Sequence, residues 1–322
     1  MKILYFIQSH TNSEQIVRLV KTIKQSSPES FVLISHNFQC TQLDTESLRC
    51  FSNLEILHCP RSRGDFSIMQ GYLDAIHWIF NNQIEFDWLV NISGQDYPTQ
   101  PIPEIEKFLH ETKYDGFLEY YKMHSITNPL SIRESTERYL YKYRSLGVSL
   151  SRWQRAIIKI PRVAINNFQS YLKISSAYGL LIGVRHIPSP FNEKFQCYTG
   201  GYYHTLSQKC IQYLYDFCQK NTDLVEYYRQ TCLPEESFIQ TVLINSDLFN
   251  ICNNSKRYVN WSNSHLGHPN ILSTEDYSRL IGGDFHFARK FDMSHDRQIL
   301  DKLDYWISQN TINELSSCHT RS

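Results

Sequence analysis

The order of apolar and polar residues over the first 120 positions predicts strands that alternate with helices. Apolar residues recur at helical spacing after Ser13, after Ser67 and around Ile105. Such alternation is typical of a mostly parallel sheet with helices on both faces, so the predicted fold class is α/β. The predicted strands are short apolar runs at Ile3–Gln8, Phe31–Ile34, Leu54–Leu57, Trp88–Ile92 and Gly116–Tyr120.

Ligands of parallel sheets bind beyond the carboxyl ends of the strands. The loops around His10, His36, Arg63 and Asp96 follow predicted strands or lie next to them, so they are the first places to expect a site.

The last third of the chain is α+β in pattern. It has a strand-like run at Tyr198–Leu206, a helix opened by Pro234-Glu235-Glu236, and a closing helix near the C-terminus.

The middle of the chain has a different composition. From position 138 to position 191 there is no acidic residue, while nine Lys and Arg side chains alternate with Tyr, Trp and Ile. This segment is either a solvated loop or a basic, amphipathic surface that contacts an anionic bilayer or a lipid-diphosphate acceptor. We therefore divide the chain into residues 1–130, an insertion at 131–195, and residues 196–322.

Composition narrows the functional class. The 32 basic and 32 acidic residues cancel, which argues against a general nucleic-acid-binding protein, and 41% hydrophobic residues argue against disorder. Nine Cys without a Cys-x-x-Cys pair indicate neither a disulfide framework nor a zinc ribbon. No apolar stretch is long enough for a membrane span and the first residues do not form a signal peptide, so we expect a cytoplasmic protein.

Four segments carry candidate chemistry, and each also has a structural explanation. The Arg63-Gly64-Asp65 segment suits a turn and helix cap, and Asp96 either caps a turn or faces a ligand. The pair Glu235-Glu236 complements a helix dipole or supplies a general base, and Arg289-Lys290 is a solvated pair or a phosphate clamp. The spacing His265-x-x-His268 could suit a metal, but two His without a third ligand are more often surface or core residues.

Together these segments resemble the core-2/I-branching β-1,6-N-acetylglucosaminyltransferase and peptide O-xylosyltransferase family, glycosyltransferase family 14. The order and spacing agree from about residue 1 to residue 305. The matching segments are Arg63-Gly64-Asp65-Phe66-Ser67, Phe86–Pro98, Pro234-Glu235-Glu236-Ser237-Phe238 and Phe287-Ala288-Arg289-Lys290-Phe291-Asp292.

The resemblance implies a GT-A fold and an inverting transfer, without a metal cofactor, from a UDP-sugar to a glycan or lipid-linked glycan. It makes residues 1–130 the nucleotide-sugar-binding half and residues 196–322 the acceptor and catalytic-base half. By position, Glu236 matches the general base, with Glu235 beside it. Arg289 and Lys290 match the pair that stabilises the leaving diphosphate, and Asp96 matches a donor or acceptor contact.

The chain departs from the family pattern at two places. The family usually has an Asp after the second strand that contacts the uridine, and here His36 and Asn37 are the candidates. The family segment Gly-Ser-x-Trp is replaced by Gly200-Gly201-Tyr202-Tyr203, whose first three residues are candidate donor or acceptor contacts.

Several alternatives stay open at this point. The sugar is GlcNAc, xylose or glucuronate. A metal-dependent transferase that uses Asp96 and a nucleotide-sugar- or glycan-binding protein without turnover are the competing functions. The resemblance is to a bacterial-type member that acts in surface polysaccharide synthesis, at the inner face of the membrane, and no motif indicates a nucleic-acid partner.

Overall fold

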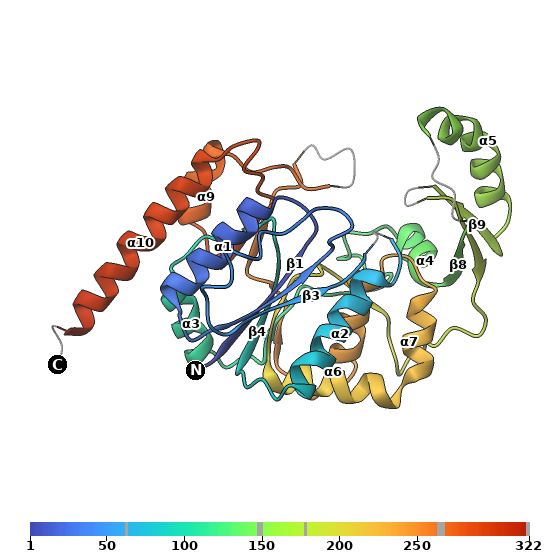
Figure 1. The fold of residues 1–322 in the computed structure, drawn as a ribbon. Helices are drawn as coiled ribbons and strands as arrows, with labels where there is room; N and C mark the ends of the chain where they lie inside the picture. The colour runs from blue at the N-terminus through green and yellow to red at the C-terminus, as the bar shows by residue number, and fades with distance from the viewer. Residues whose placement is uncertain (62–63, 147–150, 177–178, 263–267, 320–322) are drawn as a thin grey trace.

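The structure is a computed structural model that describes residues 1–61, 64–146, 151–176, 179–262 and 268–319 (Figure 1). Among these residues the central sheet has seven strands in the order β13-β6-β12-β4-β1-β2-β3. All pair in parallel except β12, which runs antiparallel to both neighbours. The strands are β1 (Ile3–Ser9), β2 (Phe31–His36), β3 (Leu54–His58), β4 (Trp88–Ser93), β6 (Gly116–Phe117), β12 (Thr205–Ser207) and β13 (Ile251–Cys252). The predicted mostly parallel α/β fold is confirmed, and the arrangement is consistent with a GT-A-like fold.

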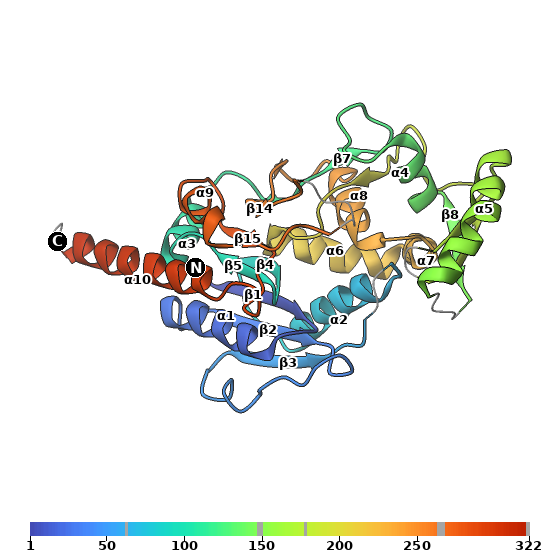
Figure 2. The ribbon, with the colours of Figure 1, turned by 90° about the horizontal axis from the view of Figure 1, so that it is seen from above.

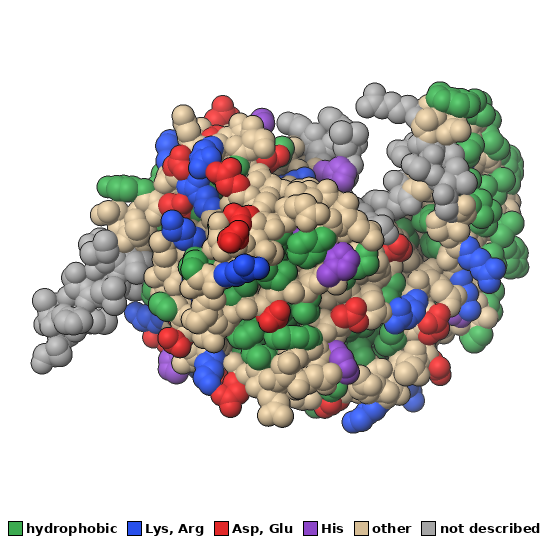
Figure 3. Space-filling view, in the orientation of Figure 1, with side chains coloured by type: hydrophobic (Ala, Val, Ile, Leu, Met, Phe, Trp, Pro, Cys, Tyr) green, Lys and Arg blue, Asp and Glu red, His purple; other side chains and the backbone are tan. Residues whose placement is uncertain are grey.

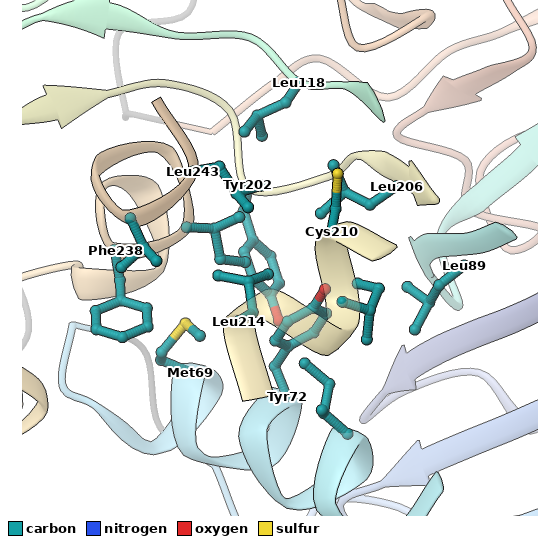
Figure 4. Close-up of a cluster of buried hydrophobic side chains, with 14 of the residues drawn as sticks. Met69, Tyr72, Leu89, Leu118, Tyr202, Leu206, Cys210, Leu214, Phe238 and Leu243 are labelled. Carbon is teal, nitrogen blue, oxygen red and sulfur yellow. The ribbon is translucent and has the colours of Figure 1, made fainter. Parts of the chain in front are cut away.

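Helices cover both faces of this sheet. They are α1 (Ser13–Ser26), α2 (Ser67–Asn81), α3 (Ile102–Glu111), α6 (Gln208–Lys220), α7 (Thr222–Arg229), α8 (Phe238–Ile244), α9 (Tyr277–Ile281) and α10 (Gln298–His319), with two 3₁₀ turns, η1 (Pro234–Glu236) and η2 (Thr274–Asp276). The side chains of β1 alternate between two cores, as the period of a strand requires. Leu4 and Phe6 pack with α2, α6 and α8, whereas Tyr5 and Ile7 pack with α1, α3 and α10. Figure 4 shows part of the first core, in which Tyr72, Leu214 and Phe238 converge from three helices.

Two smaller sheets extend the carboxyl edge of the central sheet. One joins β14 (Arg257–Val259), β15 (Phe287–Arg289) and β5 (Asp96–Pro98), and the other pairs β7 (Tyr121–Lys122) with β11 (Tyr198–Thr199). Residues 198–206 were expected to form one strand, and this prediction is wrong. The chain forms β11 in the two-stranded sheet, leaves it at Gly200, and joins the central sheet as β12 at Thr205. The segment between them faces η1, because the Gly200 N–H donates to the Glu236 carbonyl at 2.9 Å.

The insertion is an ordered unit rather than a solvated loop. After α4 (Ile132–Tyr139), β8 (Tyr141–Ser145), β9 (Leu172–Ser175) and β10 (Leu181–Arg185) form an antiparallel sheet, and α5 (Arg152–Phe168) packs on β9. Figures 1 and 2 place this unit at one end of the molecule and α10 at the other. Within the described residues, no helix has both the length and the apolar character that crossing a bilayer requires.

Candidate active site

The carboxyl ends of β1, β2 and β4 meet at one edge, as their parallel pairing requires. His36 lies buried there with both ring nitrogens in contact. Ser9 Oγ lies 2.8 Å from Nδ1, and Nε2 lies 2.7 Å from the Thr41 carbonyl. Because a carbonyl only accepts, Nε2 carries the proton and Nδ1 accepts from the serine hydroxyl. Burial lowers the pKa of His36, so the neutral ring connects the two strand ends.

Asn37 is also held by the protein, since its side chain donates to the Arg61 carbonyl at 3.2 Å and accepts from the Gln39 N–H at 3.1 Å. A ligand that contacts His36 or Asn37 through these atoms would replace an existing hydrogen bond. His10, the next residue after β1, reaches the surface. Its pKa is lowered by partial desolvation and by the positive charges of Arg61 and Lys290, one of the two candidate diphosphate-binding residues.

Asp96 and Arg289 are brought together by strand pairing. They are directly opposite each other in the antiparallel pair β5–β15, and Arg289 Nε lies 3.4 Å from Asp96 Oδ1. The Asp96 side chain is fully buried, and its other oxygen accepts from the Ser93 hydroxyl at 2.5 Å and from the Ser93 N–H. One carboxylate oxygen is therefore held by a turn, and the other faces a cation.

Tyr203 supports the same arginine. The Arg289 guanidinium lies 4.1 Å from the centre of the Tyr203 ring, which is cation–π geometry. Burial tends to lower the pKa of Arg289, but Tyr203, Asp96 and Glu236 outweigh it and the pKa is raised. Glu236, the predicted base, is thus one of the groups that raise the pKa of the predicted phosphate-binding arginine. Tyr203 stands where the family pattern has its tryptophan.

Glu236 ends the η1 turn and is held by an arginine from the insertion. Arg138 Nη1 donates to Glu236 Oε2 at 2.6 Å, and Nη2 donates to Glu134 Oε1 at 2.6 Å. The Glu236 side chain is 31% exposed, so its carboxylate is reachable from solvent. In the part of the chain that the structure describes, Oε1 accepts no hydrogen bond. The arrangement fixes one oxygen and leaves the other available to accept a proton.

Gly200 allows the Gly200–Tyr202 segment to approach Glu119. A Cβ built on Gly200 would lie 1.9 Å from the Glu119 carbonyl oxygen, whereas one on Gly201 would lie 3.2 Å from a Glu119 side-chain oxygen. The Gly201 carbonyl accepts from Gln240 at 2.8 Å. The Tyr202 ring packs against Tyr72 in the core (Figure 4).

The remaining sequence candidates are placed as follows. Glu235 is buried next to Glu236. Arg63 and His265 lie outside the described residues. Asp65 Oδ1 accepts from the Ser67 N–H at 2.8 Å, but the N-cap residue of α2 is Phe66, which makes no side-chain cap hydrogen bond. Among the described residues no group of His, Cys, Asp and Glu is arranged to hold a metal ion.

Three functional candidates were missed from the sequence: Arg61, Arg138 and Arg257. Arg61 donates to the Ser9 carbonyl at 2.9 Å and to the Ser35 carbonyl, tying β1 to β2. Arg257 is buried beneath Asp96, and burial lowers its pKa to about 10 against the opposing charge of Asp96. The sequence signal that could have identified Arg61 is its position two residues before the candidate Arg63-Gly64-Asp65 segment. No local pattern marks Arg138 or Arg257 as site residues, because Glu236 and Asp96, the candidate site residues that they face, are distant from them in sequence.

The family model described as Core-2/I-Branching enzyme matches residues 4–281. The chain belongs to this family. The resemblance inferred from the motifs is confirmed, and the shared region includes Asp96, Arg138 and Glu236 but ends before Arg289.

Curated relatives carry glycosyltransferase names. The chain is 23% identical to β-glucuronosyltransferase GlcAT14B of Arabidopsis thaliana over 68% of its own length and 44% of that protein. It is 24% identical to human xylosyltransferase 1 over 92% of its length and 29% of that protein. The chain therefore spans less than half the length of these relatives. Among solved structures, HddC from Yersinia pseudotuberculosis has a TM-score of 0.28 at 12% identity over 66% of this chain and 78% of that one, which is too low to bear on the fold.

Proposed function

We propose that this protein is an inverting glycosyltransferase that moves a sugar from a UDP-sugar to a hydroxyl of a glycan or lipid-linked glycan. The observation that carries the proposal is the partly exposed Glu236 carboxylate, which Arg138 holds at one oxygen; Glu236 also contributes to the raised pKa of Arg289. A base and a cationic diphosphate site in one environment are what a single-displacement transfer requires. The donor sugar is of the glucuronate, xylose or GlcNAc class, and the names of the relatives include the first two.

The reaction follows from these positions. Glu236 Oε1 takes the proton of the acceptor hydroxyl, and the acceptor oxygen attacks the anomeric carbon from the side opposite the diphosphate. The bond between the anomeric carbon and the phosphate oxygen breaks, and its electron pair leaves with UDP. Arg289 and Lys290 compensate the negative charge that develops on the leaving group. One displacement inverts the anomeric configuration, so an α-linked donor gives a β-linked product.

The contacts of Asp96 favour a mechanism without a metal ion. One Asp96 oxygen accepts from Ser93, and the other faces Arg289 at 3.4 Å, so the position opposite this carboxylate is taken by a guanidinium. A divalent cation bound there would meet the positive charge of Arg289. We expect transfer to persist in excess EDTA. Loss of transfer that manganese restores would instead support a metal-dependent transferase that uses Asp96.

The proposal is tested by incubating the protein with a panel of UDP-sugars and acceptor glycans and determining the product's anomeric configuration by NMR. A β-linked product from an α-linked donor is the expected result. A retained configuration would contradict the single displacement. Donor binding without hydrolysis or transfer, across the whole panel, would instead indicate a nucleotide-sugar-binding protein without turnover. We also propose that the physiological reaction belongs to surface polysaccharide synthesis.

A further inference from the structure

The helix α5 turns an apolar stripe toward solvent. At about 100° per residue, the side chains of Trp153, Ile157, Ile160 and Phe168 fall on one face of the helix, within about 80° of arc. These four side chains are 63%, 65%, 80% and 89% exposed, respectively. An amphipathic helix of a globular protein ordinarily buries such a stripe against the core.

The opposite face of α5 is the one that packs on the protein. Arg162 contacts the Ser176 hydroxyl. Asn166 accepts from the Ile174 N–H at 2.8 Å and donates to the Ile174 carbonyl at 3.0 Å. Lys173 Nζ donates to the Asn166 carbonyl at 2.7 Å. The polar face is therefore fixed on β9 by specific hydrogen bonds, which hold the apolar stripe outward.

The exposed apolar surface continues beyond the helix. Tyr171 and Leu172, just after α5, are 66% and 44% exposed, and Val184 on β10 is 51% exposed. Leu172 and Val184 are paired in register, so they lie on one face of the small sheet. Figure 3 shows hydrophobic side chains gathered over the part of the molecule where Figure 1 places α5.

Exposed cations border this surface. Lys142 pairs in register with Val184, and Arg144 pairs with Ile182, so both share a sheet face with exposed apolar residues. Lys159 is also exposed, but it lies about 140° around α5 from the centre of the stripe and does not border it. The segment 138–191 has no acidic residue. Some of its nine cations are directed into the protein, since Arg138 pairs with Glu236, Lys173 lies 3.1 Å from Glu137 and Arg162 contacts the Ser176 hydroxyl.

We propose that the stripe of Trp153, Ile157, Ile160 and Phe168, with Lys142 and Arg144, docks on an anionic lipid bilayer. A protruding apolar stripe with a tryptophan and flanking cations has the chemistry of a helix that lies in the headgroup region. Charge complementarity selects the occupant. A second copy of this chain would bring two basic surfaces together, whereas anionic headgroups compensate them. The helix α4 carries Arg138, which contacts Glu236, and leads directly into β8 of the insertion. Docking of the insertion would therefore bring this part of the candidate site near the bilayer.

The test is co-sedimentation of the full chain with vesicles of phosphatidylcholine alone and of phosphatidylcholine mixed with phosphatidylglycerol. We expect binding to the mixed vesicles only. The double substitution Ile157→Gln with Ile160→Gln should weaken this binding at least about tenfold, because it removes apolar contact without touching the packed face. Lys142→Glu with Arg144→Glu should weaken it similarly, and raising the salt concentration should do the same.

Matched control variants separate this surface from general surface effects. Ile126→Gln changes a fully exposed apolar residue outside the insertion, and Lys107→Glu reverses an exposed charge on α3. Both should bind vesicles like the original protein, and circular dichroism should show all variants folded. Equal binding to both vesicle types, no binding, or unchanged binding by the substituted proteins would overturn the proposal. A dimer that the Gln variants dissociate, without vesicle binding, would overturn it in favour of a second copy. No sugar transfer is measured, so the outcome is independent of the proposed function.

Discussion

Replacing Gly200 by alanine should displace the backbone of Glu236, the candidate base, without changing the Glu236 side chain itself. The Gly200 N–H donates to the Glu236 carbonyl at 2.9 Å, and a Cβ at Gly200 would lie 1.9 Å from the Glu119 carbonyl oxygen. Since real Cβ contacts are essentially never under 3.0 Å, the backbone must move by about 1.1 Å (3.0 minus 1.9). Overpacking of this kind costs about 1–3 kcal/mol.

Two measurements follow from that displacement. At roughly 2–4 °C per kcal/mol for a large domain, the melting temperature should fall by about 2–12 °C. A shift of about 1 Å at a reacting group costs up to about 100-fold, so kcat should fall by about 10- to 100-fold. Differential scanning calorimetry and initial-rate transfer assays measure the two effects.

Gly201→Ala is the matched control for this prediction. Its Cβ would lie 3.2 Å from a Glu119 side-chain oxygen, which can move aside, so the change in melting temperature should be under about 2 °C. If Gly200→Ala melted like Gly201→Ala and kept its kcat, the close approach of Gly200 to Glu119 would not be what positions Glu236.

Three further predictions concern the charges. Arg138→Gln should lower kcat by about 10-fold or more because Glu236 loses its orienting partner, and an unchanged kcat with an unchanged donor KM would exclude a positioning role. Arg289→Leu should weaken UDP binding measured by calorimetry by about 10-fold or more, and undiminished UDP affinity would remove Arg289 from the diphosphate site. Burial lowers the pKa of both His204 and His286 to about 3. In the unfolded chain these histidines have the ordinary pKa of about 6.5, so below that pH the unfolded state binds protons that the folded state does not bind, and the protein loses stability. Unfolding in urea should therefore require about 2 kcal/mol less per histidine at pH 5 than at pH 7, and equal stability at both pH values would contradict this.

The fold was predictable where a local pattern sets the structure. The apolar run that begins at Ile3 and the helical spacing after Ser13 both form as expected, because each buries one continuous apolar face. The single strand expected at Tyr198–Leu206 failed for a tertiary reason. The Gly200 backbone bonds to η1 rather than to a sheet neighbour, and nothing within the segment encodes that preference.

The candidate site was only partly predictable. Residue type and family spacing pointed to Glu236, Asp96 and Arg289. The direct opposition of Asp96 and Arg289 depends on the register of β5 and β15, which two distant segments set together. Arg138 was counted among the cations of the insertion, yet the packing of α4 turns it toward Glu236. A summed charge over a segment cannot separate such an inward cation from an exposed one such as Lys159.

The central claim is that Glu236 is the general base, and the substitution Glu236→Gln tests it most directly. Glu134→Gln is the matched control, because Glu134 is the other carboxylate that contacts Arg138. We expect Glu236→Gln to lower the transfer rate by about 10²- to 10⁴-fold while UDP binding measured by calorimetry stays within a few-fold, and Glu134→Gln to keep most of its activity. A Glu236→Gln protein that transfers sugar at the original rate would contradict the account.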